Sequence, residues 1–138
     1  MSRSGGRRRR GRELALRVLF ELEGTEKNHR AVLDYQCAEL EAPADVTGFA
    51  RRLVDGTLEH IEAIDMAITA ASLNWDLIDL GKVERAVLRL GAFELLFQAG
   101  TPMAVSIDES LELARVYAGD EAVPLVNGVL GQIARERA

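Results

Sequence analysis

Apolar residues recur every three or four positions along most of the chain, which is the spacing expected for one face of an α-helix. The first such segment covers about residues 10–23 and stops before Gly24, a residue type that commonly ends helices. Phe20 lies beside the apolar stripe of this segment, so it is either a peripheral core residue or an exposed aromatic side chain for a partner. The stripe consists of Leu14, Ala15, Val18, Leu19 and Leu22.

A second helix is predicted from Asn28 to about residue 41. The Asn28 side chain can accept a hydrogen bond from an unpaired amide of the first turn, and Pro43 ends the pattern. The residues expected to face inward are Ala31, Val32, Tyr35 and Leu40. Cys37 is the only cysteine, so no intrachain disulfide forms and a reducing compartment fits. We interpret it as a small buried residue rather than a nucleophile.

A third helix, capped by Asp45 or Thr47, keeps its apolar stripe as far as Ile68, so we predict one long helix here. Gly56 lies in the middle of this helix and costs about 1 kcal/mol relative to alanine. A close crossing with a second helix would explain why the glycine is tolerated.

The second half of the chain continues in the same way. A short turn over residues 77–80 precedes segment 82–100, which is apolar on most sides and is therefore predicted to be the central helix. Residues 106–109 have the form of a capping box that opens a sixth helix, and Pro124 suits the first turn of a seventh. No segment alternates like a strand. We predict an all-α fold of about seven helices joined by short loops.

Charge is unevenly distributed along the chain. Residues 1–12 contain six arginines and no acid, whereas residues 13–138 contain the other eleven basic residues and all twenty-two acids. Residues 1–9 are expected to form a flexible, disordered basic arm, because residues 1–6 have no apolar anchor and contain two glycines. Residues 10–138 are expected to form a single helical domain. Such asymmetry is typical of an arm that binds nucleic acid, although a solvated tail has the same composition.

The chain shows no catalytic or metal-binding motif. His29, His60 and Cys37 do not have the spacing of metal ligands, and glycine-rich nucleotide-binding loops are missing. The acids at residues 108–109 and 120–121 are explained by the dipole at helix starts. The longest apolar run is too short to span a membrane. We therefore expect a cytoplasmic binding protein that is not an enzyme and has no cofactor.

Four segments give the chain a recognisable likeness. They are RRRRGRELALRVLF at the start, FARRLVDGTLEHIEAID over residues 49–65, KVERAVLRLGAFELL over residues 82–96, and TPMAVSIDESLELARVYAGDEAVPLVNGVLGQI over residues 101–133. In their order and spacing they resemble the NusB family of bacterial transcription antitermination factors. The resemblance implies two small packed helical bundles. It also implies a protein that pairs with NusE, a small-subunit ribosomal protein. Together the pair would bind boxA RNA in nascent ribosomal RNA transcripts and join the RNA polymerase antitermination complex.

The resemblance also implies which residues make these contacts. RNA-binding positions are Arg8, Arg9, Arg10, Arg12, Asp120, Glu121 and Leu125. The NusE-facing positions are Phe20 and Glu84. Arg85 and Arg89 either flank that surface or only form ion pairs along the helix face.

The chain departs from the family pattern at three positions. Leu125 replaces an aromatic residue that can stack on a base, Phe20 stands where tyrosine is common, and Asp108 replaces an asparagine. Two other functions stay open at this point: an RNA-targeting module of a ribosomal RNA cytosine methyltransferase, and a self-associating helical protein that binds polyanions without selectivity. Whether the chain is a monomer or a homodimer is also open.

Overall fold

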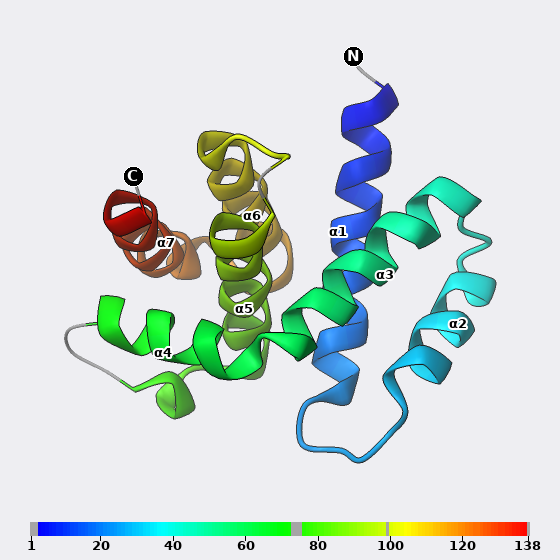
Figure 1. The fold of residues 1–138 in the computed structure, drawn as a ribbon, viewed down its shortest axis with the longest axis horizontal. Coiled ribbons are helices and arrows are strands. Elements are labelled where there is room, and N and C mark those ends of the chain that lie inside the picture. Colours follow the sequence, from blue (N-terminus) through cyan, green and yellow to red (C-terminus); the bar gives the residue numbers. More distant parts are fainter. Residues whose placement is uncertain (1–2, 73–75, 99, 138) are drawn as a thin grey trace. The chain divides into compact units, whose positions relative to one another are not determined.

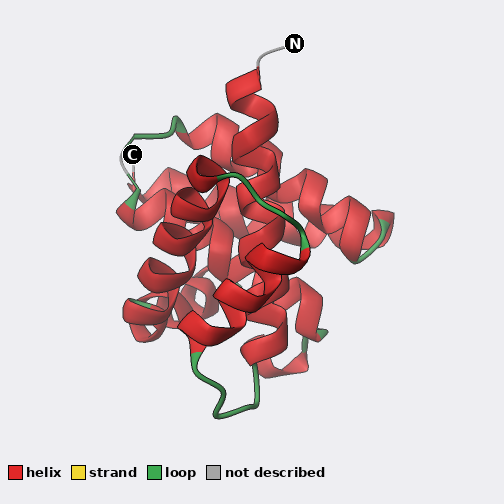
Figure 2. Cartoon of the chain, turned by 90° about the vertical axis from the view of Figure 1, so that its right-hand side faces the viewer, coloured by secondary structure: helices red, strands yellow, loops and turns green. Residues whose placement is uncertain are grey.

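A computed structural model describes residues 3–72, 76–98 and 100–137 of the protein. Over these residues every regular element is a helix, as predicted (Figure 2). Seven are α-helices, α1 to α7 (Figure 1), and two are short 3-10 helices, η1 (Leu77–Asp79) and η2 (Asp120–Ala122). The chain divides into two compact units, residues 1–55 and residues 56–138, in agreement with the two small bundles that were expected.

The first unit contains α1 (Arg3–Leu22), α2 (His29–Glu39) and most of α3 (Ala44–Glu59). The apolar stripe predicted for the first helix is buried from Leu14 to Leu19. Phe20 lies outside this stripe and is 42% exposed, so it belongs to the surface rather than to the core. The largest side chains of the unit that are fully buried, at less than 2% exposure, are Leu14, Val18, Leu33, Val46, Leu53 and Val54.

The structure includes residues 3–9, which were expected to form a flexible arm, in α1. The helix begins at Arg3, earlier than the predicted start near residue 10, so the predicted arm is helical from residue 3 onward. Residues 1 and 2 lie outside the described residues. Arginine is a good helix former, and Arg7 and Arg8 contact side chains of α3, which adds tertiary support to the first turns. The side chains of Arg7 and Arg8 are therefore held in defined directions against α3.

The cap of α2 was predicted correctly, but its inward face was not. Asn28 Oδ1 accepts a hydrogen bond from the Ala31 amide at 3.0 Å. Of the four residues expected to face inward, only Val32 is buried, and the buried face is completed by Leu33 and Cys37. Tyr35 is 65% exposed, and its hydrogen bond with Glu39 raises the pKa of the Tyr35 phenol. Apolar residues occur on both sides of this helix, so periodicity alone did not identify the inner one.

The single long helix predicted over residues 45–68 is interrupted. α3 ends at Glu59 and α4 (Ile61–Ala71) begins after His60, whose φ of −107° and ψ of 21° are not helical. The His60 ring stacks on Phe97, with the ring centroids 4.0 Å apart and the planes at 11°. This stacking is a tertiary contact, so the apolar stripe that continues through the break could not reveal it. α4 is therefore the fourth of the seven α-helices, and the turn near residue 77 is only the 3-10 helix η1.

The second unit is organised around α5 (Lys82–Phe97), which was predicted to be the central helix. It packs against α4, α6 (Met103–Tyr117) and α7 (Val123–Arg137), and it is buried at nine of its residues. The close crossing predicted at Gly56 is confirmed, because a Cβ at this position would overlap the ring of Phe93. Pro124 is in the first turn of α7, as predicted.

The predicted start of the sixth helix was wrong. α6 begins at Met103, directly after Pro102, so Ser106 does not cap it. Ser106 is instead 1% exposed, and its hydroxyl donates a hydrogen bond to Glu94 Oε1 at 3.3 Å. The serine hydroxyl is used to satisfy a carboxylate that is itself 2% exposed within the second unit.

Candidate nucleic-acid interface

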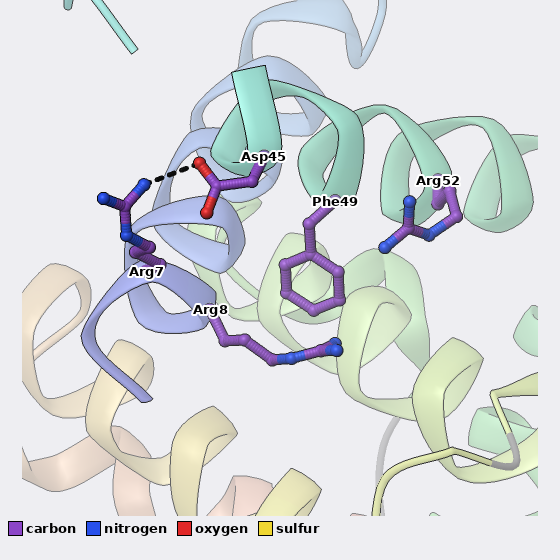
Figure 3. Close-up of a pocket in the computed structure, with 5 residues that line it drawn as sticks. All are labelled: Arg7, Arg8, Asp45, Phe49 and Arg52. Carbon is purple, nitrogen blue, oxygen red and sulfur yellow. Dashed lines mark hydrogen bonds and ion pairs between the residues drawn. The ribbon is translucent and has the colours of Figure 1, made fainter. Parts of the chain in front are cut away.

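Positive charge gathers between α1 and α3 in the first unit. Arg7 and Arg8 project from α1, and Asp45, Phe49 and Arg52 from α3, so that together they line a cavity of about 170 Å³ (Figure 3). Arg7 Nη1 donates to Asp45 Oδ1 at 2.7 Å, and both side chains stay about half exposed. We call these five residues the arginine pocket. It contains three guanidinium groups and one carboxylate.

Phe49 forms the floor of the arginine pocket. The Arg8 guanidinium carbon lies 4.6 Å from the centroid of the Phe49 ring, and that of Arg52 lies 5.7 Å away. Arg12 approaches the same ring at 5.5 Å. Contacts of this kind contribute about 0.5–1 kcal/mol each where they are exposed. Three cations from two helices are thus arranged around one aromatic ring.

Gly11 allows this ring to lie against α1. The Phe49 side chain is only 4% exposed, and a Cβ added at Gly11 would stand 2.6 Å from Phe49 Cδ2. Any larger residue at this position of α1 would push the ring or the helix away. The glycine that follows the arginine run therefore has a packing role at the pocket.

The four arginines expected to contact RNA are not equivalent. Arg8, Arg9 and Arg10 are exposed, whereas Arg12 is 3% exposed. The guanidinium of Arg12 lies beside Phe49. A side chain buried in this way is suited to positioning the Phe49 ring and is less suited to contacting a phosphate that approaches from solvent.

Sequence reasoning missed part of the arginine pocket. Phe49 begins the apolar stripe predicted for the third helix and Asp45 was expected to cap that helix, while Arg52 was given no role. Positions 45, 49 and 52 are spaced so that they share one face of a helix, which was the available signal. That this face meets the arginine run was not visible in the sequence.

The turn that opens α7 belongs to the second unit. Asp120 and Glu121 are exposed in η2, and Leu125 follows, half-buried, in the first turn of α7. Gly119 precedes them with a φ of 107°, a conformation that favours glycine. A hydrogen bond with Glu112, assisted by the charge of Asp120, raises the pKa of Arg115. The two acids and Leu125 are therefore presented together on a turn with a defined backbone.

The residues expected to face NusE lie on both units, Phe20 on the first and three charged residues on α5 of the second. Arg89 Nε and Nη2 donate to the two carboxylate oxygens of Asp65 at 2.8 and 3.0 Å, so its ion pair joins α5 to α4 and does not run along one helix face. Arg85 donates to the carbonyls of Ile78 and Leu80 beside η1. Both guanidinium groups are thus held in place within the second unit.

Glu84 lies at the start of α5 and is half-buried. Its carboxylate folds back over Gly81, where an added Cβ would come within 2.6 Å of Glu84 Oε1. A carboxylate at this end of a helix interacts favourably with the helix dipole.

Other site types have little support in the described part of the chain. No group of three or more histidine, cysteine, aspartate or glutamate residues there is arranged to hold a metal ion. Cys37 is buried. Among the described helices, none is long and apolar enough to cross a membrane.

The comparisons with known proteins agree with this picture. Residues 9–135 match the model of the NusB family. The chain is 40% identical over 130 residues to the transcription antitermination protein NusB of Exiguobacterium sp., which covers 94% of this chain and 98% of that protein. The protein of the same name from Sorangium cellulosum is 43% identical over 132 residues, covering 94% and 92% of the two chains.

Two solved structures are similar over the same length. A T. maritima NusB structure has a TM-score of 0.87 and 35% identity, covering 94% of this chain and 91% of that chain. A chain of a crystal structure of antitermination factors NusB and NusE in complex with dsRNA has a TM-score of 0.87 and 30% identity, covering 95% and 98%. This chain, with its seven described α-helices and its arginine-rich start, therefore belongs to the NusB family.

Proposed function

We propose that this protein is a transcription antitermination factor that pairs with NusE and binds boxA RNA in nascent ribosomal RNA transcripts. The observation that carries the proposal is the similarity, over 95% of this chain, to one chain of a solved complex of NusB and NusE with dsRNA. The arginines of α1 support the RNA part of it. The role is non-catalytic: two proteins form one RNA-binding surface in the antitermination complex of RNA polymerase, in the cytoplasm.

The alternative role as a targeting module of a methyltransferase has less support. Relatives named as antitermination proteins match this chain over 98%, 92% and 88% of their own length. In these three relatives the similarity thus covers most of a protein that carries the antitermination name.

RNA is contacted by two groups of residues with different tasks. Arg8, Arg9 and Arg10 meet phosphates, which holds the RNA without reading its sequence. Asp120 and Glu121 accept hydrogen bonds from exposed base edges, as carboxylates do for unpaired bases. Leu125 makes an apolar contact that supplies only part of the roughly 1–3 kcal/mol available from base–aromatic stacking. Arg12, being buried, contributes by holding Phe49.

NusE is contacted by the exposed ring of Phe20 and by the start of α5. Glu84 offers a carboxylate there, and Arg85 and Arg89 present guanidinium groups whose directions are set by their bonds within the second unit. Preorganised charges of this kind favour specificity and fast association.

The salt dependence of RNA binding tests the RNA part. A boxA-like single strand and a scrambled strand are titrated with and without NusE at several salt concentrations. Replacing Arg8, Arg9 and Arg10 together by glutamine should flatten the slope of log K against log salt by about 2, since each phosphate contact contributes about 0.7 on a single strand. Equal binding of both strands in the presence of NusE would contradict a boxA function.

A charge reversal on α5 tests the NusE part. Glu84→Lys should abolish pairing with NusE in a pull-down while the helical circular dichroism signal is retained. Asp108→Lys, a reversal of an exposed acid on α6, is the matched control and should pair normally. Pairing that survives Glu84→Lys would remove this residue from the interface.

A further inference from the structure

We propose that the arginine pocket binds one backbone phosphate of the RNA, and that Arg52 of α3 is a phosphate-contacting residue. The inference deepens the proposed function and rests on it, because the ligand is the RNA that the α1 arginines attract. It extends the RNA site from α1 to α3, within the first unit.

The charges in the pocket are incompletely balanced. Asp45 pairs with Arg7, whereas an ion-pair partner for Arg8 or Arg52 is not found among the described residues. Two guanidinium groups beside one ring repel each other, and an anion between them removes that repulsion. A site with this arrangement attracts anions even though the whole chain carries a net charge of −5.

The shape of the pocket favours a phosphate over a base. Its volume of about 170 Å³ corresponds to roughly five or six waters at about 30 Å³ each, enough for a phosphodiester group. Phe49 is 4% exposed and already has guanidinium groups beside its ring, so it offers no free face for stacking a base. Phosphate oxygens, by contrast, fit the outward N–H groups of arginine.

The pocket is preorganised for this task. Arg8 is held by its contact with Phe49 at 4.6 Å, and Arg52 reaches the same ring from the other helix (Figure 3). A guanidinium that stacks on a ring keeps its N–H donors in one plane, where they can form paired hydrogen bonds with phosphate oxygens. Less freedom is then lost on binding than for an unsupported surface arginine.

Asp45 limits what the pocket accepts. Its carboxylate lines the cavity, 2.7 Å from Arg7, and repels any anion that enters. A small free anion has only the pocket to bind to, whereas an RNA strand also contacts Arg9 and Arg10 on the same helix. Asp45 thus favours the polymer over inorganic phosphate.

The test compares neighbouring arginines of α3. Arg52→Gln should weaken binding of the boxA-like RNA about three- to tenfold and lower the salt slope by about 0.7, the contribution of one phosphate on a single strand. Arg51→Gln is the matched control, because Arg51 pairs with Asp34 and does not line the pocket. It should bind like the wild type. Arg52→Lys should keep the slope but lose part of the affinity, since lysine keeps the charge without the planar fork.

Two further arms complete the experiment. Asp45→Asn should tighten RNA binding, and inorganic phosphate should compete with RNA only weakly in the wild type. Wild-type RNA affinity and slope in a folded Arg52→Gln variant would overturn the pocket while leaving the proposed function intact. A wild-type protein that binds no boxA RNA, with or without NusE, would overturn both. Strong competition by inorganic phosphate would overturn the assignment to RNA.

Discussion

Replacing Gly56 by alanine should destabilise the protein, although helix propensity predicts the opposite. Gly56 lies inside α3, where alanine is more favourable than glycine by about 1 kcal/mol. The new Cβ, however, would overlap the ring of Phe93 on α5. Overpacking of this kind costs about 1–3 kcal/mol. The clash involves three atoms of a rigid ring, so we expect the upper part of that range and a net loss of about 1–2 kcal/mol.

Urea unfolding followed by circular dichroism measures this difference. In thermal unfolding of a chain of this size, a loss of about 1–2 kcal/mol should lower Tm by several degrees. Gly48→Ala is the matched control on the same helix, since its nearest neighbour would be Arg52 Nη1 at 3.9 Å, an ordinary contact. It should gain up to about 1 kcal/mol.

A double variant separates the two effects. Leucine at position 93 lacks the outer ring atoms that meet the new methyl group, so Gly56→Ala should become neutral or stabilising in a Phe93→Leu background. If Gly56→Ala alone raised the stability as much as Gly48→Ala, the packing argument at this crossing would be refuted.

Three further predictions concern stability. Asn28→Ala should lower the free energy of unfolding by about 1 kcal/mol, because it removes the cap of α2. Asn28→Asp should retain most of the stability of the wild type, as measured by urea unfolding. Asp65→Asn should lower the free energy of unfolding by about 1–2 kcal/mol, because the Arg89 and Asp65 side chains that form the paired hydrogen bonds are only a fifth to a third exposed. A double-mutant cycle with Arg89→Met that shows no coupling would contradict this prediction. The hydrogen bond with Gln36 lowers the pKa of Glu21 below its usual 4.5. The ionised Glu21 carboxylate therefore stabilises the fold above pH 4.5, and this stabilisation is lost as the pH falls through the lowered pKa of the folded state. The stability difference between wild type and Glu21→Gln should therefore shrink from about pH 6 to about pH 3, and a constant difference would exclude this origin.

Substitutions in the arginine pocket and in the surface expected to face NusE should affect different properties of the protein. Charges in the arginine pocket are exposed and act on RNA through electrostatics, so their removal should change the salt slope more than the stability. Arg85 and Arg89 are bonded to neighbouring elements of the second unit. Their removal should affect both stability and NusE pairing, which makes Glu84 the cleaner probe of that interface.

The sequence alone determines that the chain is helical and where several of the helices begin or end. The apolar stripe of α1, the cap at Asn28 and the position of Pro124 are local properties, decided by residues within about one turn of each other. The close crossing at Gly56 was also predictable, because a glycine inside a helix needs a packing reason. The likeness to the NusB family was visible in four segments and is confirmed by the match over residues 9–135.

Only the tertiary structure decided the remaining features. The break at His60 depends on stacking against Phe97, which lies on another helix. Ser106 is buried and donates a hydrogen bond to Glu94, a residue of another helix. Contacts with α3 support the helical start of the chain. The arginine pocket exists because Gly11 lets Phe49 lie against α1, where charges from two helices meet. Periodicity reports which side of a helix is apolar, but it carries no information about which side chains of different helices will meet. That depends on how the helices pack.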